Sequence, residues 1–214
     1  MPEGVELRGV QLPGRGNRMA EEPISDIHTA ATRLLNAITP LCDRPLVFFG
    51  HSNGGLVAYK LAQRLLAQAP HLGAHLQHLV ISGKPAPHIP PPKVRHNLSE
   101  DELIEELQDY GGTPPELLQH REFMELMTPM IRADFALSEL YHPQPGPPLE
   151  LPVSLWWGAD DKIVPSEQVL AWEPYLAQVV DRHCFAGGHF YLHDSRDEVV
   201  GRVLPLLEAA MAAA

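Results

Sequence analysis

The chain has 214 residues, enough for one domain with a sizeable core, and 44% of them are hydrophobic. A formal net charge of −11 argues against nucleic acid or an anionic membrane as a partner. No apolar run reaches the length of a membrane span, and no basic-then-apolar leader is visible, so a cytoplasmic protein is expected. The two cysteines, Cys42 and Cys184, are far apart, and we interpret them as free thiols in a reducing compartment.

The first part of the chain alternates predicted strands and helices. Residues 6–12 alternate weakly and predict a strand, and residues 27–41 carry apolar side chains at helical spacing. The apolar segment 45–49 predicts a buried strand, 56–68 a helix, and 79–83 the next buried strand. This order is typical of an α/β fold, with a mostly parallel sheet and helices on both faces.

A Gly-x-Ser-x-Gly sequence, from Gly50 to Gly54, lies between the second predicted strand and the helix that follows it. Strand, sharp turn and helix form the context of a nucleophile elbow, in which glycines leave room for a tight turn beside the serine. Ser52 is therefore the predicted nucleophile. The backbone N–H of Asn53, at the start of the helix, is predicted to point at a developing oxyanion.

Proline is about twice as frequent as in an average protein, with 22 in 214 residues, and it clusters near residues 85–92 and 143–152. The helical segment between these clusters predicts an insertion, residues 85–148, within a single domain 1–214. Ser99 and Glu102 predict a capping box at the first helix of the insertion. A second helix is expected from Pro115 and a third over 129–141.

The last part of the chain returns to strands. Residues 153–157 and 181–185 predict strands, and 166–176 predict a helix between them. Ser195 and Glu198 are expected to cap a C-terminal helix as a second capping box.

A serine hydroxyl is a weak nucleophile, so a histidine must take its proton and a carboxylate must orient that histidine. Among twelve histidines, His189 lies on a glycine-flanked loop directly after the last predicted strand, and we expect it to be the base. Asp160 and Asp161 both follow a predicted strand, and Asp161 is the preferred carboxylate. Asp160 and Asp194 are interpreted as a turn residue and a surface residue. The side chain of His51, inside the elbow, is expected to point away from the serine.

The inserted helices carry a methionine-rich face with Met124, Met127 and Met130, and Phe135 is a further apolar position. Methionine fills ordinary cores and also lines adaptable binding surfaces, so two interpretations stay open. These residues either form the core of the insertion or face an acyl chain beneath a flexible lid.

The chain resembles type II thioesterases, the free-standing editing hydrolases of polyketide and nonribosomal peptide antibiotic synthesis. The resemblance covers nearly the whole chain and depends on Gln11-Leu12-Pro13-Gly14-Arg15, Phe49-Gly50-His51-Ser52-x-Gly54, Gly111-Gly112-Thr113-Pro114, Arg132-Ala133-Asp134, Gly158-x-x-Asp161 and Gly187-Gly188-His189-Phe190. It implies an α/β-hydrolase fold with a catalytic triad of Ser52, Asp161 and His189 and a helical lid. It also implies hydrolysis of acyl groups from the phosphopantetheine arm of acyl or peptidyl carrier proteins, with acyl-CoA as a weaker substrate. No cofactor or metal is implied.

Two departures from the family accompany this resemblance. Asn53 stands where the family usually has methionine, although only its backbone is needed for the oxyanion. The family's Phe-Pro-x-Ala-Gly-Gly loop, which supplies the other oxyanion N–H, is not found before Gly4. We therefore expect an N-terminally truncated domain that is a weak catalyst.

Other functions share these motifs. A general carboxylesterase or lipase would have the same triad, and a catalytically impaired hydrolase fragment would only bind a partner. Because carrier proteins are generally acidic, docking is expected to be weak and to use small basic spots at the start of the insertion. The candidates are Lys84, Lys93, Arg95 and His96.

Overall fold

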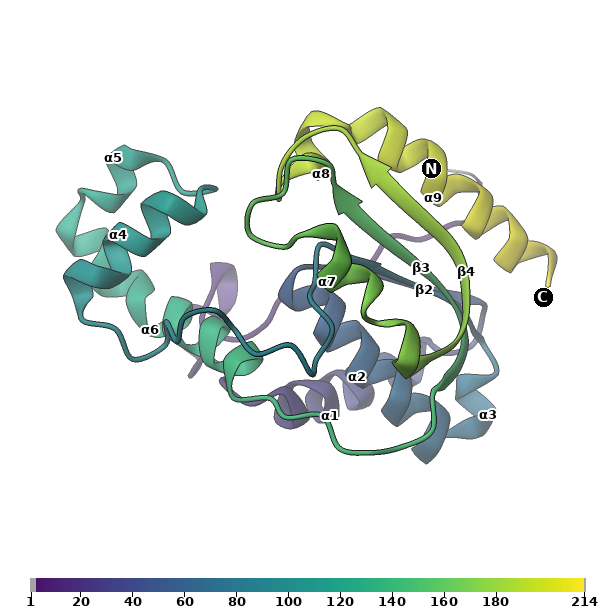
Figure 1. The fold of residues 1–214 in the computed structure, drawn as a ribbon. Coiled ribbons are helices and arrows are strands. Elements are labelled where there is room, and N and C mark those ends of the chain that lie inside the picture. The colour runs from purple at the N-terminus through teal and green to yellow at the C-terminus, as the bar shows by residue number, and fades with distance from the viewer. Residues whose placement is uncertain (1–2, 214) are drawn as a thin grey trace. The chain divides into compact units, whose positions relative to one another are not determined.

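The computed structural model describes residues 3–213, which divide into two compact units (Figure 1). The sheet unit comprises residues 3–8, 31–89 and 143–213, and the helical unit comprises residues 9–30 and 90–142. The helical unit is thus built from two separate stretches of chain, one of which lies well before the predicted insertion. The assignment of residues 85–148 as a lid within one domain stays a prediction.

The sheet unit contains a four-stranded sheet in the order β1-β2-β3-β4, and every neighbouring pair is parallel. The strands are β1 (Leu46–His51), β2 (Leu76–Ser82), β3 (Leu149–Gly158) and β4 (Leu176–Phe185). The register places His51 beside Ser82 and Ser82 beside Trp156, so the carboxyl ends of the strands meet at one edge. The predicted α/β architecture with a parallel sheet is confirmed.

Helices cover both faces of this sheet. Helix α2 (Asn53–Gln68), followed by α3 (Pro70–Gly73), lies on one side, and α9 (Arg196–Ala212) lies on the other (Figure 1). Buried residues from the strands and from the C-terminal part of the chain form one core cluster, which comprises Val80, Trp156, Phe185, Tyr191 and Val199. The continuous apolar runs of β2 and β3 are explained by this two-sided burial.

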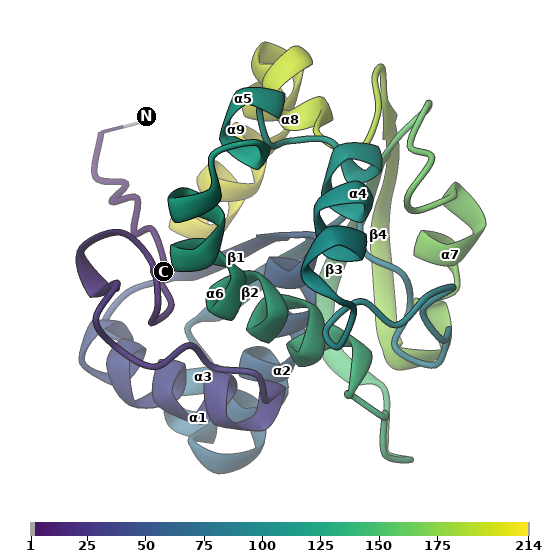
Figure 2. The same cartoon turned by 90° about the vertical axis from the view of Figure 1, so that its left-hand side faces the viewer.

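The helical unit is organised by three helices, α4 (Glu100–Tyr110), α5 (Pro115–Leu118) and α6 (Arg121–Glu139), which gather into one cluster in both views (Figures 1 and 2). Their shared core consists of Leu103, Leu107, Leu118 and Met124. Helix α1 (Ile27–Ile38) begins in this unit and continues into the sheet unit, ending in a 3-10 turn at Thr39–Leu41. Within residues 3–213, no helix is long and apolar enough to cross a membrane.

Two motifs of the resemblance meet inside the helical unit. The Arg15 guanidinium donates two hydrogen bonds to the Asp134 carboxylate, at 3.0 and 2.8 Å. Arg132 donates from Nη1 to the carbonyl oxygen of His96, at 2.9 Å. A bidentate arginine–carboxylate pair fixes relative orientation as well as distance, so it joins the 9–30 stretch to α6 in one geometry.

The predicted strand over residues 6–12 is wrong. This stretch pairs with no strand, and residues 6–11 are exposed, with Leu7 at 80%. A strand is stabilised by hydrogen bonds to a neighbour and by burial of one face, and residues 6–12 have neither.

The predicted start of the third inserted helix at Pro129 is also wrong, because α6 begins eight residues earlier, at Arg121, and contains Pro129 in its interior. The His120 imidazole caps the helix by accepting from the Phe123 N–H at 3.2 Å. Burial of Met124 in the core of the helical unit holds the first turns in place, and this packing overrides the local preference of proline.

Two further boundaries and one helix cap differ from the sequence predictions. The helix predicted over 166–176 is the short helix α7 (Ser166–Leu170) followed by a 3-10 turn, and β4 starts at Leu176. Ser195 makes no side-chain cap to α9, since its hydroxyl donates to the carbonyl of Ala186 at 2.9 Å. Glu198 instead pairs with His183 at 2.7 Å.

The capping box of α4 is confirmed and gives a stability prediction. The Glu102 N–H donates to the Ser99 hydroxyl at 3.3 Å, and the Ser99 N–H donates to the Glu102 carboxylate at 2.9 Å. Ser99→Ala should therefore destabilise α4 by about 1 kcal/mol, measured by hydrogen exchange of the α4 amides. Ser166→Ala is the matched control, because Ser166 starts a helix without capping it. If both variants lost the same protection of the α4 amides against exchange, the stabilising role of the Ser99–Glu102 capping box would be contradicted.

Candidate active site

The turn between β1 and α2 holds Ser52 in a strained backbone conformation. Ser52 has φ 51° and ψ −124°, and among residues 3–213 it is the one non-glycine residue with positive φ. Such a conformation costs about 1–3 kcal/mol and persists where surrounding contacts enforce it. Here the Ser52 N–H donates to the Ser82 carbonyl at 2.8 Å, and the Gly55 N–H donates to the Ser52 carbonyl at 2.9 Å. The turn therefore has the backbone geometry of a nucleophile elbow, and the role of Ser52 as nucleophile stays a prediction.

The two glycines of the motif have different roles. A Cβ on Gly50 would collide with the backbone of Gly54 and Gly55. The end of β1 and the start of α2 are therefore too close together at this point for any side chain on residue 50. A Cβ on Gly54 would meet nothing within 4 Å. The expectation that the turn is too tight for a side chain therefore applies to Gly50, and no contact in the structure requires glycine at position 54.

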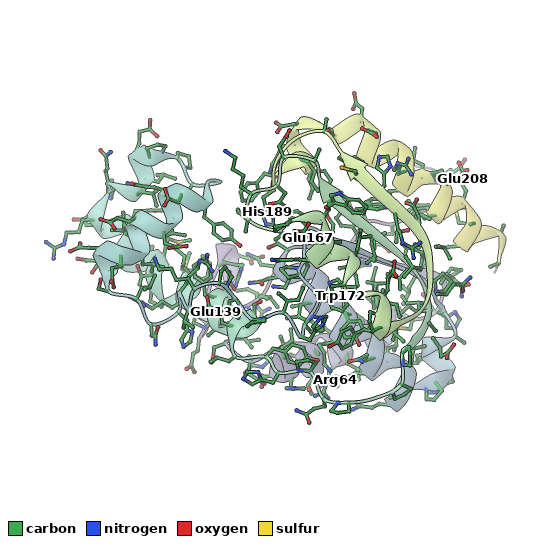
Figure 3. The ribbon with its side chains drawn as sticks, in the orientation of Figure 1. Arg64, Glu139, Glu167, Trp172, His189 and Glu208 are labelled. Carbon is green, nitrogen blue, oxygen red and sulfur yellow. The ribbon has the colours of Figure 1, made fainter. Side chains whose placement is uncertain are left out.

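His189 lies in the loop after β4 and is labelled in Figure 3. This loop is bound to the end of β3, since the Ala159 N–H donates to the Phe185 carbonyl at 2.8 Å and the Asp160 N–H to the Gly187 carbonyl at 2.9 Å. A Cβ on Gly158 would collide with the carbonyl oxygens in this loop. The glycine thus allows the loop that carries His189 to pack directly against the end of β3.

The structure brings the three predicted triad residues together. His189 Nε2 lies 3.2 Å from the Ser52 hydroxyl, and His189 Nδ1 lies 2.8 Å from Asp161 Oδ2. The other carboxylate oxygen of Asp161 accepts from the N–H groups of Ile163 and Val164, both at 2.9 Å. The side chains of His189 and Asp161 are 3% and 0% exposed. This arrangement can activate the serine hydroxyl, with the histidine as base and the aspartate as its orienting partner.

The choice between the two neighbouring aspartates is explained by their surroundings. Asp160 is exposed, whereas Asp161 turns inward to His189. Burial raises the pKa of Asp161, but hydrogen bonds from His189, Val164 and Ile163 outweigh it, and the pKa is lowered overall. The charged carboxylate therefore adds stability above its unfolded-state pKa, and this contribution is lost as the pH falls through the folded value.

Asn53 is the first residue of α2, so its backbone N–H lies at the positive end of a 16-residue helix. Its side chain differs from the family's methionine in a specific way, because its amide oxygen accepts from Lys84 Nζ at 2.9 Å. Lys84 is 8% exposed, and its carbonyl oxygen accepts from the Trp172 indole at 2.9 Å (Trp172 is labelled in Figure 3). This burial beside the elbow differs from the expected solvent-facing docking role of Lys84.

The other proposed docking residues are held by acidic partners within the helical unit. Lys93 Nζ contacts the Glu106 carboxylate at 2.5 Å, and Arg95 Nε contacts it at 2.8 Å. The guanidinium of Arg95 also lies over the Tyr110 and Phe135 rings, at 5.6 and 5.8 Å. The lysine side chain is 48% exposed and that of Arg95 is 14% exposed, so Lys93 is the more accessible cation of the two.

The predicted lid residues occupy different environments. Met124 is 1% exposed and belongs to the core of the helical unit, which supports the structural interpretation for this residue. Met127 and Met130 are half-buried, and Phe135 packs partly buried against the same core. Their contact with an acyl chain stays a prediction.

The sequence did not predict a series of hydrogen bonds that lies next to the triad and joins His51, Ser82 and Tyr191. His51 Nδ1 lies 2.7 Å from the Ser82 hydroxyl, which lies 2.5 Å from the Tyr191 hydroxyl. A serine ending a buried strand and a tyrosine two residues after the predicted base were available signals, but neither forms a recognisable motif. Among residues 3–213, no group of three or more His, Cys, Asp or Glu side chains has an arrangement that could hold a metal ion.

The match to known proteins decides the family. Residues 1–207 match the model of the thioesterase domain, a stretch that includes Ser52, Asp161 and His189. The chain belongs to the thioesterase domain family. It is therefore a thioester hydrolase with an α/β-hydrolase fold, and the predicted resemblance to type II thioesterases is confirmed.

Individual relatives agree with this assignment. Thioesterase PikA5 of Streptomyces venezuelae is 33% identical and is matched over 91% of this chain and 69% of its own length. A protein named linear gramicidin dehydrogenase LgrE, from Brevibacillus parabrevis, is 32% identical over 98% of this chain and 80% of its own. The solved structure of YbtT, a type II thioesterase from the yersiniabactin pathway, has a TM-score of 0.86 at 34% identity, covering 94% of this chain and 82% of that one.

The role of Gly50 gives a prediction that separates the two glycines of the thioesterase elbow. Gly50→Ala should lower the free energy of unfolding by roughly 1–3 kcal/mol or more, because backbone atoms must move to admit the methyl group. Gly54→Ala should leave stability unchanged or raised, since alanine favours the helix. Thermal and denaturant unfolding of the two variants would measure the difference, and equal stabilities would contradict the close approach.

Proposed function

We propose that this thioesterase hydrolyses acyl groups from the phosphopantetheine arm of acyl or peptidyl carrier proteins, as an editing enzyme of polyketide or nonribosomal peptide synthesis in the cytoplasm. Acyl-CoA would be a weaker substrate of the same site. The observation that carries the proposal is the hydrogen-bonded series Ser52–His189–Asp161, in which the histidine and the aspartate are buried. The family match and the pathways named for YbtT and similar proteins support the choice of substrate.

The proposed mechanism assigns one role to each residue of the series. His189 Nε2 takes the Ser52 hydroxyl proton as the serine oxygen attacks the thioester carbonyl, and Asp161 stabilises the imidazolium that forms. The Asn53 N–H donates to the oxyanion of the tetrahedral intermediate. The thiol of the phosphopantetheine arm leaves with the proton from His189, and water, activated by His189, then hydrolyses the acyl-serine ester.

The carrier protein would contribute binding energy that a small ester lacks. Contacts away from the reacting carbonyl raise kcat/KM when they help to hold the substrate in its reactive position. Lys93 and Arg95 remain candidates for such contacts, although Glu106 already compensates part of their charge. Met127, Met130 and Phe135 remain candidates for contact with the acyl chain.

The substrate assignment is tested with one acyl group presented in three ways: on a holo carrier protein, on coenzyme A, and as an oxygen ester. We expect kcat/KM to fall in that order, and Ser52→Ala to lose hydrolysis of all three by several orders of magnitude while keeping its melting temperature. A higher kcat/KM for the oxygen ester than for both thioesters would identify a carboxylesterase. Ser52→Ala with near-parental activity would remove Ser52 from the mechanism.

The two aspartates provide a matched test of the mechanism. Asp161→Asn should lower kcat by about 10³–10⁴-fold, because an amide no longer stabilises the imidazolium or selects its tautomer. Asp160→Asn, one residue away and exposed, should stay close to the parental kcat. Steady-state kinetics on a single acyl thioester would rank them, and the reverse order would show that the wrong carboxylate has been assigned.

A further inference from the structure

A second histidine lies against the proposed base. His51 is the last residue of β1, immediately before the nucleophile, and its ring centroid is 4.9 Å from that of His189, at an interplanar angle of 46°. A Cβ on Gly83, which has φ +54°, would lie 2.8 Å from His51 Cε1 and 3.4 Å from His189 Cε1. Both imidazoles therefore pack close to Gly83, and a side chain at position 83 would clash with the His51 ring.

The position of His51 is also fixed by two buried hydroxyl groups. Nδ1 lies 2.7 Å from the hydroxyl of Ser82, the last residue of β2, and that hydroxyl lies 2.5 Å from the Tyr191 hydroxyl. Ser82 and Tyr191 are both 0% exposed. Because Tyr191 follows His189 by two residues, this series of hydrogen bonds connects the loop of the base to the ends of β1 and β2.

His51 is held uncharged in this position. Burial, and to a smaller extent the neighbouring His189, lower the pKa of His51 to about 4, against smaller opposite effects of Asp161 and of the His189 backbone. Burial also raises the pKa of Tyr191, so its hydroxyl keeps a proton to donate. Within residues 3–213, His51 Nε2 is buried and makes no regular hydrogen bond, although the His189 backbone lies close enough to affect its protonation.

We propose that His51 is a positioning residue for the base: its ring, fixed by Ser82 and Tyr191, supports the His189 imidazole in the orientation that directs Nε2 to Ser52 and Nδ1 to Asp161. The inference rests on the proposed catalytic roles of these three residues. A neutral neighbour is suited to this position, because His189 becomes positively charged as it takes the serine proton and a second charge so close would oppose that step.

The test substitutes His51 and Tyr191 separately. His51→Phe keeps a ring but cannot bond to Ser82, His51→Asn keeps a polar group near the position of Nδ1, and Tyr191→Phe removes only the terminal hydroxyl. We expect His51→Phe to lower kcat about 10- to 100-fold with little change in KM, because a misplaced base slows chemistry without weakening substrate binding. Tyr191→Phe should have a smaller effect in the same direction, and His51→Asn should recover part of the loss.

A double mutant tests the connection through Ser82. Ser82→Ala should lower kcat less than His51→Phe does, and the two changes combined should cost no more than His51→Phe alone, since both remove the same hydrogen bond. Additive losses would show that Ser82 acts on the base by another route and would overturn the proposed series.

The chain contains a matched control for a merely structural effect. His78 is a buried histidine in β2, with Nε2 2.9 Å from the Ser154 hydroxyl, but no hydrogen bond or ring contact joins it to the triad. His78→Phe should change the melting temperature while leaving kcat close to the parental value. Similar kcat losses in His78→Phe and His51→Phe, a raised KM with unchanged kcat in His51→Phe, or parental kinetics in His51→Phe would each overturn the proposal.

Labelling of Ser52 by a fluorophosphonate separates this inference from the proposed function. A parent protein that hydrolyses the acyl thioester but is not labelled at Ser52 would contradict the proposed nucleophile. A parent that is labelled and active, together with a His51→Phe variant of equal labelling rate and kcat, would contradict the positioning role alone.

Discussion

The backbone of Ser52 is the constraint on which the rest of the site depends. With φ at 51°, the serine places its hydroxyl 3.2 Å from His189 Nε2. The close approach of Gly50 to Gly54 and Gly55, and the hydrogen bond from the Ser52 N–H to β2, hold the turn in that shape. The same turn begins α2 at Asn53, so the strained turn that carries Ser52 also places a helix N-terminus beside this residue.

The other two members of the site reach Ser52 because parallel strands end at the same edge of the sheet. Asp161 follows β3 and His189 follows β4. His189 Nε2 therefore comes within 3.2 Å of the Ser52 hydroxyl, although the two residues are 137 positions apart in sequence. Backbone hydrogen bonds between the two loops restrict their relative movement. Burial of Asp161 and His189 then strengthens the hydrogen bond between them, since electrostatic interactions are stronger in a low-dielectric surrounding.

The parts of this site that could be predicted are those set by local sequence and strand order. The spacing of two glycines between an apolar run and a helix predicts the elbow. Asp161 and His189 can be predicted because each directly follows a later predicted strand. The support around His51 could not be predicted in this way, because it depends on which strand lies beside β1 and on the direction of the Ser82 side chain. Lys84 shows the same limitation, since a lysine near a proline cluster looks exposed until its burial against Asn53 is known.

Fold boundaries were least predictable where packing competes with local preference. Proline normally marks a helix start, yet α6 runs through Pro129 because Met124, one turn earlier, is buried in the core of the helical unit. Residues 6–12 show the opposite case, in which a weak alternating pattern finds no neighbouring strand and stays irregular. In both cases the deciding interaction involves residues distant in sequence, which local periodicity does not report.

Not every motif of the family carries chemistry. Arg15 and Asp134 come from two separate signature stretches, and they form a salt bridge with each other. Glu139 (labelled in Figure 3) likewise accepts from the backbone N–H groups of Arg95 and His96, which holds the loop that leads into α4. These contacts hold the helical unit together, whereas Ser52, Asp161 and His189 all follow the ends of strands in the sheet unit.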